Sequence, residues 1–533
     1  MSALPYRQRR TSLTARGEPM VWLTGAGLAV ATLMISGLLL LVILNGTATF
    51  WPKPLRLVTL ANGQQFLGEA TRYETLVREG VLVERVLLRT GNFDLYGDDF
   101  KWVNLRDLQR VEYPLDAWLF ERQEWGPFIG YIRAVRIDGV PVTLEQFETL
   151  RRDARQRFRQ IRHLEKHVIG GINARLEALR LQQRRAELQG KTLDISDKRA
   201  ALEAKYNEVT AQLTALRRED QRFTVLLAEA GGRTKELRLS EIVRAYPANR
   251  LTTTQQARVY LSRWWEFLTS EPREANTEGG VLPAIFGTVL MTLIMSVAVA
   301  PFGVIAALYL REYARQGPLL SAVRIAVNNL AGVPSIVFGV FGLGFFCYVV
   351  GGTIDSLFYP EKLPTPTFGT GGILWASLTL ALLTVPVVIV ATEEALAAVP
   401  RSMREGSYAC GASKWQTIWR IVLPRAMPGV MTGLILAMAR GAGEVAPLMI
   451  TGVVKLAPEL PIDGNPPFFH LSRSFMHLGF HIYDVGFQSR NSEAGKPMVY
   501  TTTLLLILLI ALLNISAIYI RNRLRRRFVG AQF

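Results

Sequence analysis

The chain is 533 residues long, with 49% hydrophobic residues, 20% charged residues and a formal net charge of +17. This composition is too apolar for an ordinary soluble enzyme and indicates a membrane protein. The basic residues are concentrated in short segments beside apolar runs, so the charge indicates membrane topology and not a nucleic-acid-binding face. The two cysteines, Cys347 and Cys410, are isolated and predict neither a disulfide framework nor a metal site.

Six apolar runs are long enough to cross about 30 Å of hydrocarbon as helices. They cover residues 20–51, 281–310, 325–354, 370–392, 426–454 and 499–520. The first run follows a basic tail, but it is too long for a signal peptide and no A-x-A-like site closes it. We therefore expect an uncleaved first transmembrane helix over residues 20–50 and a core of five more helices over residues 281–520.

The orientation of these helices follows from the basic residues in the short segments between them. Arginines gather in four such segments, represented by Arg10, Arg311, Arg404 and Arg526. Six crossings place all four segments on one face, which the positive-inside rule identifies as the cytoplasm. The sequence thus predicts cytoplasmic tails at 1–19 and 521–533, and a periplasmic insert at 51–280.

The insert begins with strand-like segments and continues with helical ones. Short alternating runs separated by turns such as Ala61–Asn62–Gly63 predict a β-rich base over residues 51–142. A capping box at Thr143–Gln146 opens a helical hairpin over residues 143–220. Its second helix carries apolar residues in heptad steps, which predicts a coiled coil; they are Leu202, Tyr206, Val209, Leu213 and Leu216.

The return segment, residues 221–280, is expected to hold a β-hairpin and then an aromatic helix with Trp264, Trp265 and Phe267, suited to the membrane interface. Two interpretations of the whole insert remain open. It is either a structural stalk with solvated charged faces or a docking surface for an external partner.

A charged segment at residues 400–425 separates the fourth and fifth runs. Its residues follow the spacing E-x5-G-x9-I-x-L-P, with Glu405, Gly411, Ile421, Leu423 and Pro424 in the fixed places. Glycine permits a sharp turn there, and proline lacks the N–H that a continuing helix needs. Trp415, Ile418 and Ile421 form a short apolar stripe. The spacing resembles the cytoplasmic coupling loop of ABC-importer permeases, which implies docking on a separate ATPase; the alternative is an ordinary amphipathic connector.

Arg440 and Glu444 stand one helical turn apart in the fifth run. Ionisable groups within a membrane cost about 2.5–3.5 kcal/mol each on insertion scales, so they indicate a translocation pathway. Arg440 offers a planar fork of donors to an oxyanion, and Glu444 can accept a proton from hydrogen phosphate. The alternative is a self-contained ion pair. Asn328 and Asn329 are weaker pathway candidates that could equally bond a neighbouring helix.

Several longer motifs resemble the PstA family of phosphate ABC-transporter permeases. They are residues 279–288, 328–339, 392–396 and 440–448. The resemblance implies a transport subunit without a cofactor, paired with a second permease subunit, PstC, two ATPase copies and a periplasmic phosphate-binding protein. The sequence has no G-x-x-x-x-G-K-[ST] motif, so ATP hydrolysis must come from a partner. The long insert departs from compact family members.

The sequence therefore predicts an all-α polytopic permease with six transmembrane helices and a periplasmic insert, surrounded by membrane lipid in the bacterial inner membrane. Its expected role is inward movement of inorganic phosphate. One alternative is a permease of the same architecture for another oxyanion. Another is a membrane sensor or scaffold that signals through the coiled coil, which the short cytoplasmic segments disfavour.

Overall fold

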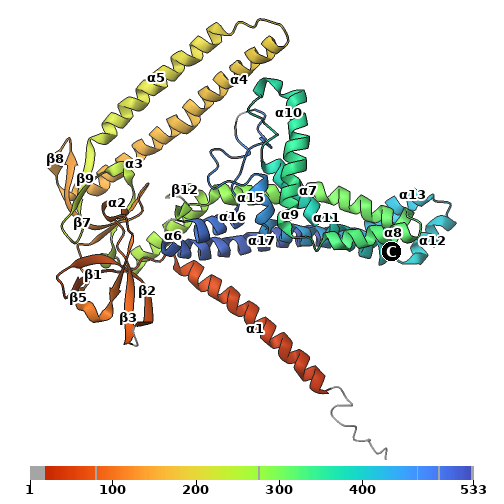
Figure 1. The fold of residues 1–533 in the computed structure, drawn as a ribbon, viewed down its shortest axis with the longest axis horizontal. Coiled ribbons are helices and arrows are strands. Elements are labelled where there is room, and N and C mark those ends of the chain that lie inside the picture. The colour runs from red at the N-terminus through yellow and green to blue at the C-terminus, as the bar shows by residue number, and fades with distance from the viewer. Residues whose placement is uncertain (1–17, 79–80, 274–275, 465, 490–491, 530–533) are drawn as a thin grey trace, which may run out of the picture.

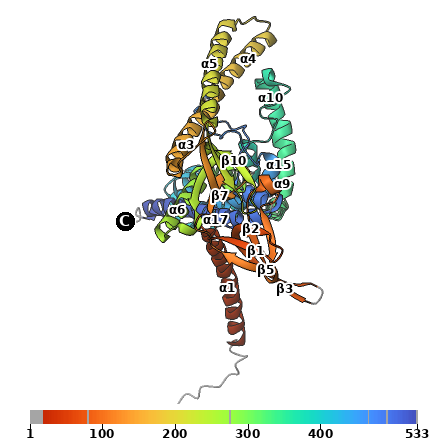
Figure 2. The ribbon, with the colours of Figure 1, turned by 90° about the vertical axis from the view of Figure 1, so that its left-hand side faces the viewer.

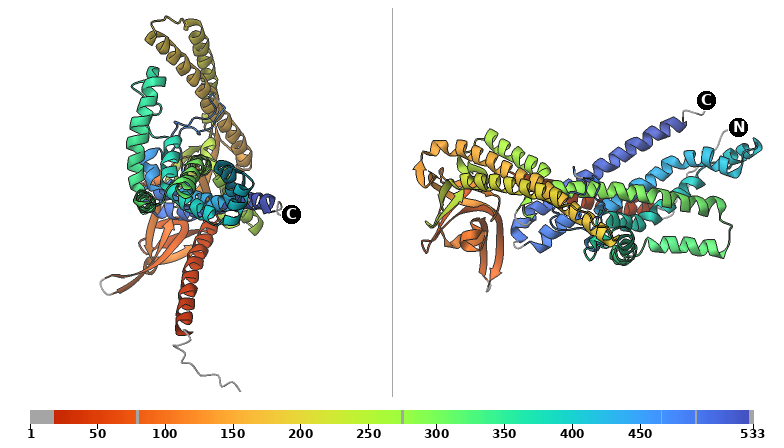
Figure 3. Two further views of the ribbon diagram at one scale, coloured as in Figure 1. Left: turned by 90° about the vertical axis from the view of Figure 1, so that its right-hand side faces the viewer. Right: turned by 90° about the horizontal axis from the view of Figure 1, so that it is seen from above.

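The computed structural model describes residues 18–78, 81–273, 276–464, 466–489 and 492–529. Within them, six helices are long and apolar enough to cross a membrane: Met20–Ala48, Leu282–Tyr313, Ser335–Phe358, Ile373–Ala397, Lys414–Gly443 and Glu493–Arg523. The prediction of a polytopic membrane protein is confirmed. The strands lie at one end of the helical bundle, and helices α12 (Arg401–Ala409) and α13 (Lys414–Thr417) lie at the other (Figures 1 and 3).

The centre of the bundle is α11 (Ile373–Ala397), packed between α7 (Leu282–Leu308) and α14 (Leu423–Gly443). Small residues let these helices approach closely. A methyl group on Gly433 of α14 would come within 2.6 Å of the Ala391 Cβ, and one on Gly303 of α7 within 2.5 Å of the Val388 side chain. By contrast, α1 (Glu18–Ala48) touches mainly α17 (Ser492–Val529) and leaves most of its apolar surface exposed.

The third and fifth spans differ from their predicted limits. The predicted run 325–354 is divided, because α8 (Pro318–Leu330) ends before Pro334 and a new helix begins at Ser335. That helix comprises α9 (Ser335–Phe341), a π-helical stretch (Gly342–Gly351) and α10 (Gly352–Phe358). Proline disfavours helical backbone in the residue before it, which explains the break.

The helix that contains the fifth span begins earlier and ends earlier than the predicted apolar run. It starts at Lys414 and stops at Gly443, and the short α15 (Ala446–Thr451) follows. Glu444 has extended backbone, with φ −76° and ψ 142°. Pro447 at the start of α15 again accounts for the interruption.

The described part of the insert contains two larger antiparallel sheets and a two-stranded one, β12 (Pro272–Arg273) with β13 (Glu278–Gly279), which confirms the expectation of β-structure. The first has the order β4-β3-β2-β1-β5 and is built from β1 (Leu55–Leu60), β2 (Gln65–Arg78), β3 (Val81–Arg89), β4 (Phe100–Asn104) and β5 (Leu108–Glu112). The second has the order β10-β9-β7-β6-β11, with β8 beside β7. Its strands are β6 (Trp118–Arg122), β7 (Phe128–Ile137), β8 (Val140–Val142), β9 (Phe223–Ala228), β10 (Thr234–Arg238) and β11 (Ile242–Pro247). The return segment therefore completes the second sheet.

The helical hairpin is an excursion between two strands of the second sheet. It consists of α3 (Phe147–His163), a π-helical stretch (Leu164–Ile169), α4 (Gly170–Leu188) and α5 (Ser196–Gln221). The predicted capping box does not form, since Thr143 makes no side-chain cap bond. Val209 and Leu213 are buried, Leu202 and Leu216 are half-buried, and Tyr206 is exposed, so the heptad seam is only partly packed.

The hairpin does not stand free of the helical bundle. It rises from the sheets and passes beside α10 (Figures 1 and 2), and the Arg184 guanidinium donates to the Leu363 carbonyl at 2.8 Å. The aromatic helix α6 (Thr253–Thr269) is also packed against protein. Phe267 is fully buried and Trp264 meets Phe50 edge-on at 5.1 Å, so of the three predicted interfacial aromatics only Trp265 is largely exposed.

Candidate functional site

The segment between α11 and α14 folds as two short helices joined by a tight turn. Gly411 has φ +79°, which confirms the sharp turn predicted there. This left-handed backbone is accessible to glycine without a Cβ clash. After the turn, Ser413 starts α13 with a capping box, in which the Gln416 side chain accepts from the Ser413 N–H at 2.9 Å.

Polar contacts fix this segment to the neighbouring helix end. The hydroxyls of Ser407 and Thr417 are 2.9 Å apart and join α12 to α13. The Arg404 guanidinium binds the Glu312 carboxylate at 3.0 Å, and Lys414 donates to the Glu312 carbonyl. Because Glu312 lies at the end of the α7 span, movement of the segment is mechanically linked to that span.

The exposed face of the segment differs from the predicted apolar stripe. Trp415 is 58% exposed and Trp419 is 59% exposed, and their rings stack at 5.7 Å between centroids. Ile418 is buried and Ile421 is half-buried, so of the three stripe residues only Trp415 is largely exposed. Glu405 is exposed on α12. The i, i+4 spacing of the tryptophans was the sequence signal for this pair.

Leu423 and Pro424 do not end a helix, contrary to the expectation from proline. A π-helical stretch (Ile418–Val422) runs directly into α14, and Pro424 lies in the first turn of that helix. A π turn already displaces the regular i to i−4 hydrogen bonds, so a residue without an N–H is accommodated there.

Arg440 and Glu444 lie at the end of α14, where the helix stops. Their closest atoms, Arg440 Nε and Glu444 Oε1, are 3.6 Å apart, and the two side chains are 36% and 21% exposed. The Arg440 guanidinium donates no hydrogen bond to any described residue, so its donors remain available. Breaks in membrane helices are places where transporters expose polar groups to a substrate path.

Asn328 lies at a different place, on α8. It lines a hollow of about 330 Å³ together with Glu394 of α11 and Leu436 of α14. The structure does not bring Asn329, Arg440 or Glu444 into this hollow. Glu394 was missed as a candidate, although a carboxylate near the end of an apolar run was the available signal. Its neighbour Glu393 pairs with Arg324 at 3.2 Å.

Comparison with known proteins places this arrangement in a family. Residues 299–529 match the family described as binding-protein-dependent transport system inner membrane component. The chain is 33% identical over 267 residues to the phosphate transport system permease protein PstA 1 of Mycobacterium tuberculosis, covering 50% of this chain and 78% of that protein. The chain belongs to the PstA family of permeases.

Other PstA-family and related proteins give shorter matches. A phosphate transport system permease protein PstA of Yersinia pestis is 38% identical over 35% of this chain and 56% of its own length. A probable ABC transporter permease protein, YqgH of Bacillus subtilis, is 34% identical over 37% of this chain, and the match spans 62% of that relative. Among solved structures, the inward-facing MetNI methionine ABC transporter has a TM-score of 0.34 at 19% identity, covering 46% of this chain and 95% of that one.

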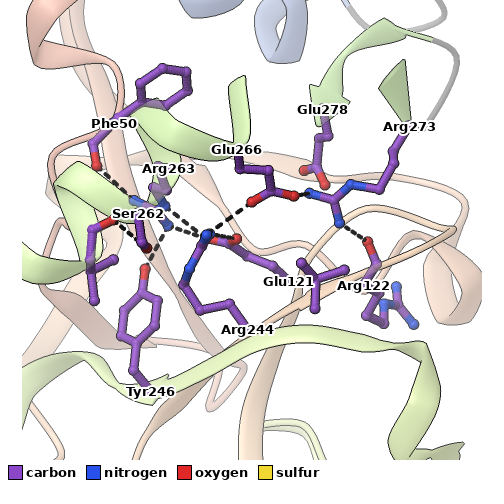
Figure 4. Close-up of polar contacts among 12 residues, drawn as sticks. Phe50, Glu121, Arg122, Arg244, Tyr246, Ser262, Arg263, Glu266, Arg273 and Glu278 are labelled. Atoms are coloured by element: carbon purple, nitrogen blue, oxygen red, sulfur yellow. Dashed lines mark hydrogen bonds and ion pairs between the residues drawn. The ribbon is translucent and has the colours of Figure 1, made fainter. Parts of the chain in front are cut away.

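Membership of the PstA family identifies the chain as a membrane transport component and not an enzyme. The family match starts at residue 299, so the sheets and hairpin lie outside it. Within the insert, a half-buried ion-pair network connects the second sheet, α6 and Arg273 (Figure 4). Glu121 binds Arg263 at 2.7 Å and also contacts Arg244, while Glu266 binds Arg244 at 2.9 Å and Arg273 at 2.7 Å.

Arg263 extends this network to the first span. It donates to the Phe50 carbonyl at 3.0 Å and to the Tyr246 hydroxyl at 2.6 Å. Burial alone would raise the pKa of Glu121, but the charges of Arg263, Arg244 and Arg273 outweigh burial and hold that pKa at about 2. Glu121 and Arg263 are 142 residues apart, so no local sequence pattern predicted the network.

Proposed function

We propose that this chain is the permease subunit through which inorganic phosphate enters the cell, driven by ATP hydrolysis on a separate subunit. The observation that carries the proposal is the 33% identity to a phosphate transport PstA over 267 residues. The proposed organisation is a cytoplasmic tail (1–19), a first span (20–50), a periplasmic insert (51–280), a permease core (281–520) and a second cytoplasmic tail (521–533).

The proposed orientation places both termini and residues 400–425 in the cytoplasm. It is supported by the basic residues in the short segments. It is also supported by the positions of the β-sheets and the α12–α13 segment at opposite ends of the bundle (Figure 1). A periplasmic location would leave the insert accessible to a substrate-binding protein.

We assign the coupling surface to the segment that contains Glu405, Gly411, Ile421, Leu423 and Pro424. Trp415 is its exposed anchor, because a stacked tryptophan pair offers a large apolar area to a groove. Gly411 sets the angle between α12 and α13. The contacts of Arg404 and Lys414 with Glu312 would transmit movement of this segment to the α7 span. The proposed partners are an ATPase dimer, the second permease subunit PstC and a periplasmic phosphate-binding protein.

Arg440 and Glu444 are the proposed contacts for the translocating anion. A phosphate ion leaving water needs compensating positive charge and several donors, which a guanidinium with free donors supplies. The long 3.6 Å contact leaves Arg440 available to exchange Glu444 for an anion. Asn328 and Asn329 on α8 are secondary pathway candidates, and Asn328 is the better placed because it lines the hollow beside Glu394.

Deletion of the gene for this chain tests the proposal in cells. Uptake of [32P]phosphate from dilute medium should fall to the level of any remaining transporter, while uptake of [35S]sulfate should not change. Expression of the intact chain should restore phosphate uptake. Loss of sulfate uptake instead would identify a permease for another oxyanion, and unchanged uptake of phosphate would contradict the proposal.

A further inference from the structure

A cavity of about 440 Å³ lies where the first span meets the insert. Its walls come from the end of α1, the beginning of α17, the strands of both sheets and helix α6. This cavity is separate from Arg440, from Asn328 and from the coupling segment, none of which lines it. Its polar wall contains the ion-pair network of Figure 4.

The cavity carries an excess of positive charge. Seven of its lining side chains are cationic and five are carboxylates. The carboxylates at the network are already engaged: Glu121 and Glu266 each bind two arginines, and Glu278 binds Arg89 at 2.9 Å. The excess positive charge therefore belongs to cationic side chains whose donors are not all taken up by these carboxylates.

Two lining cations, Lys53 and Arg89, have donors that no described residue occupies. The buried Nε of Arg89 has no hydrogen-bond partner among the described residues, although the same guanidinium pairs with Glu278 through Nη2. Lys53, in the linker between α1 and β1, lines the cavity, is exposed and forms no ion pair with any described residue. Both side chains line the cavity, so an anion there would gain charge-assisted bonds from the amine and the guanidinium.

Part of the cavity lining comes from membrane helices. Asn45 and Ala48 come from α1, and Met498 and Tyr500 come from α17. Trp51, another lining residue, is 41% exposed, and aromatic residues of this kind favour the boundary between headgroups and hydrocarbon. Farther along α1 the apolar side chains are exposed, as expected for a lipid-facing helix. The cavity thus combines cationic side chains with residues of two membrane helices.

We propose that this cavity binds a phosphate group, with Lys53 and Arg89 as its principal ligands. Amines and guanidiniums form strong charge-assisted bonds to phosphate oxygens. The group can belong to the headgroup of an anionic phospholipid or to free inorganic phosphate. The membrane-helix lining favours the lipid. A bound lipid would contact both the insert and the membrane helices and would stabilise the position of the insert.

The experiment uses the complete transporter complex, purified through this chain in detergent and stripped of lipid. Phosphatidylglycerol, phosphatidylcholine and [32P]orthophosphate are titrated separately, and the bound ligand is measured after rapid gel filtration. Lys53→Gln removes one exposed cation, Ala494→Trp fills the cavity, and Lys191→Gln at the hairpin tip is the matched control. Co-purification of the other subunits verifies that each variant assembles.

The proposal predicts saturable binding of phosphatidylglycerol that Lys53→Gln weakens roughly three- to five-fold, the weight of one partly exposed charge. Ala494→Trp should abolish this binding and Lys191→Gln should not affect it. The same pattern for orthophosphate, with no pattern for the lipid, would also support the site and identify free phosphate as its ligand. If neither Lys53→Gln nor Ala494→Trp changed the binding of the lipid or of orthophosphate, the proposal would be overturned.

Discussion

Arg440 and Glu444 are adjacent, but their contact is longer than those of the ion-pair network at Glu121 and Glu266. The closest atoms are 3.6 Å apart, against 2.7 Å for Glu266 and Arg273. Tight, multiply bonded pairs hold elements together, whereas a long contact at a helix end leaves both charges free to exchange partners. This difference underlies the assignment of Arg440 to the anion path.

A double-variant cycle distinguishes an anion contact from a simple ion pair. Arg440→Leu alone should abolish phosphate uptake. If the two residues only neutralise each other, adding Glu444→Leu should restore uptake, because no uncompensated charge remains. We predict that the double variant assembles but stays inactive. Uptake is measured with [32P]phosphate, and recovery in the double variant would reduce these residues to a structural pair.

Gly411 allows a second prediction at the level of one residue. Alanine at φ +79° is strained by roughly 1–2 kcal/mol, so Gly411→Ala should re-angle α12 against α13 and weaken co-purification of the ATPase subunit. Gly63 in the first sheet has φ +80° and nothing near its Cβ position, so Gly63→Ala carries the same backbone strain far from the coupling surface. Equal ATPase recovery with the two variants would contradict the assignment.

At the scale of elements, the apolar runs predicted that six spans exist but not where they begin and end. Pro334 divides the predicted third run. By contrast, Pro424 lies in the first turn of α14, where the helix continues without a break from a π-helical stretch. The two prolines have the same local chemistry, and the outcome depends on the tertiary environment. For the same reason the coupling turn was predictable from Gly411, whereas the burial of Ile418 was not.

The short helix α16 (Leu478–Tyr483) introduces buried histidines that no sequence pattern singled out. His477 is fully buried and His481 is 3% exposed. Burial lowers the pKa of His477 to about 3. Burial is also the main cause that lowers the pKa of His481 to about 4, with Asp484 opposing the shift and Lys455 adding to it. Both side chains are therefore neutral in the folded protein at neutral pH.

These shifts predict an acid-sensitive fold. An unfolded histidine binds a proton below about pH 6.5, while these folded ones do not, so stability is retained above pH 6.5 and falls as the pH is lowered toward 4. At pH 5 the loss for His477 is about 2 kcal/mol. The Tm of the purified complex between pH 7.5 and 5 measures it. His477→Gln should flatten the pH dependence, and the exposed His163→Gln should leave it unchanged; identical slopes for all three proteins would contradict the prediction.

At the scale of the whole molecule, the main features that sequence reasoning missed are long-range contacts. The return strands β9 and β11 complete a sheet begun 100 residues earlier, and the Glu121–Arg263 contact joins distant segments. Alternation predicted strands because it is a local property, but strand pairing and ion pairing depend on tertiary packing. The Arg184–Leu363 contact of the hairpin is also a long-range contact that no local pattern predicts.

Topology is testable through cysteines. Cys410 is free and exposed in the coupling segment, and Cys347 is free and buried. In a Cys410→Ser background, Gln189→Cys at the end of α4 should react with a membrane-impermeant maleimide in intact spheroplasts. The native Cys410 should react only after the membrane is permeabilised. The reverse pattern would invert the proposed orientation and place the coupling surface on the wrong side for an ATPase.

The central claim, ATP-driven phosphate import through this chain, is tested most directly in proteoliposomes that contain the complex purified with it. We predict that [32P]phosphate accumulates in the lumen to which the coupling segment faces. Accumulation should require ATP in that lumen and the phosphate-binding protein outside. It should fall with Gly411→Ala and be lost with Arg440→Leu. Absence of phosphate accumulation by a fully assembled complex that hydrolyses ATP would contradict the account.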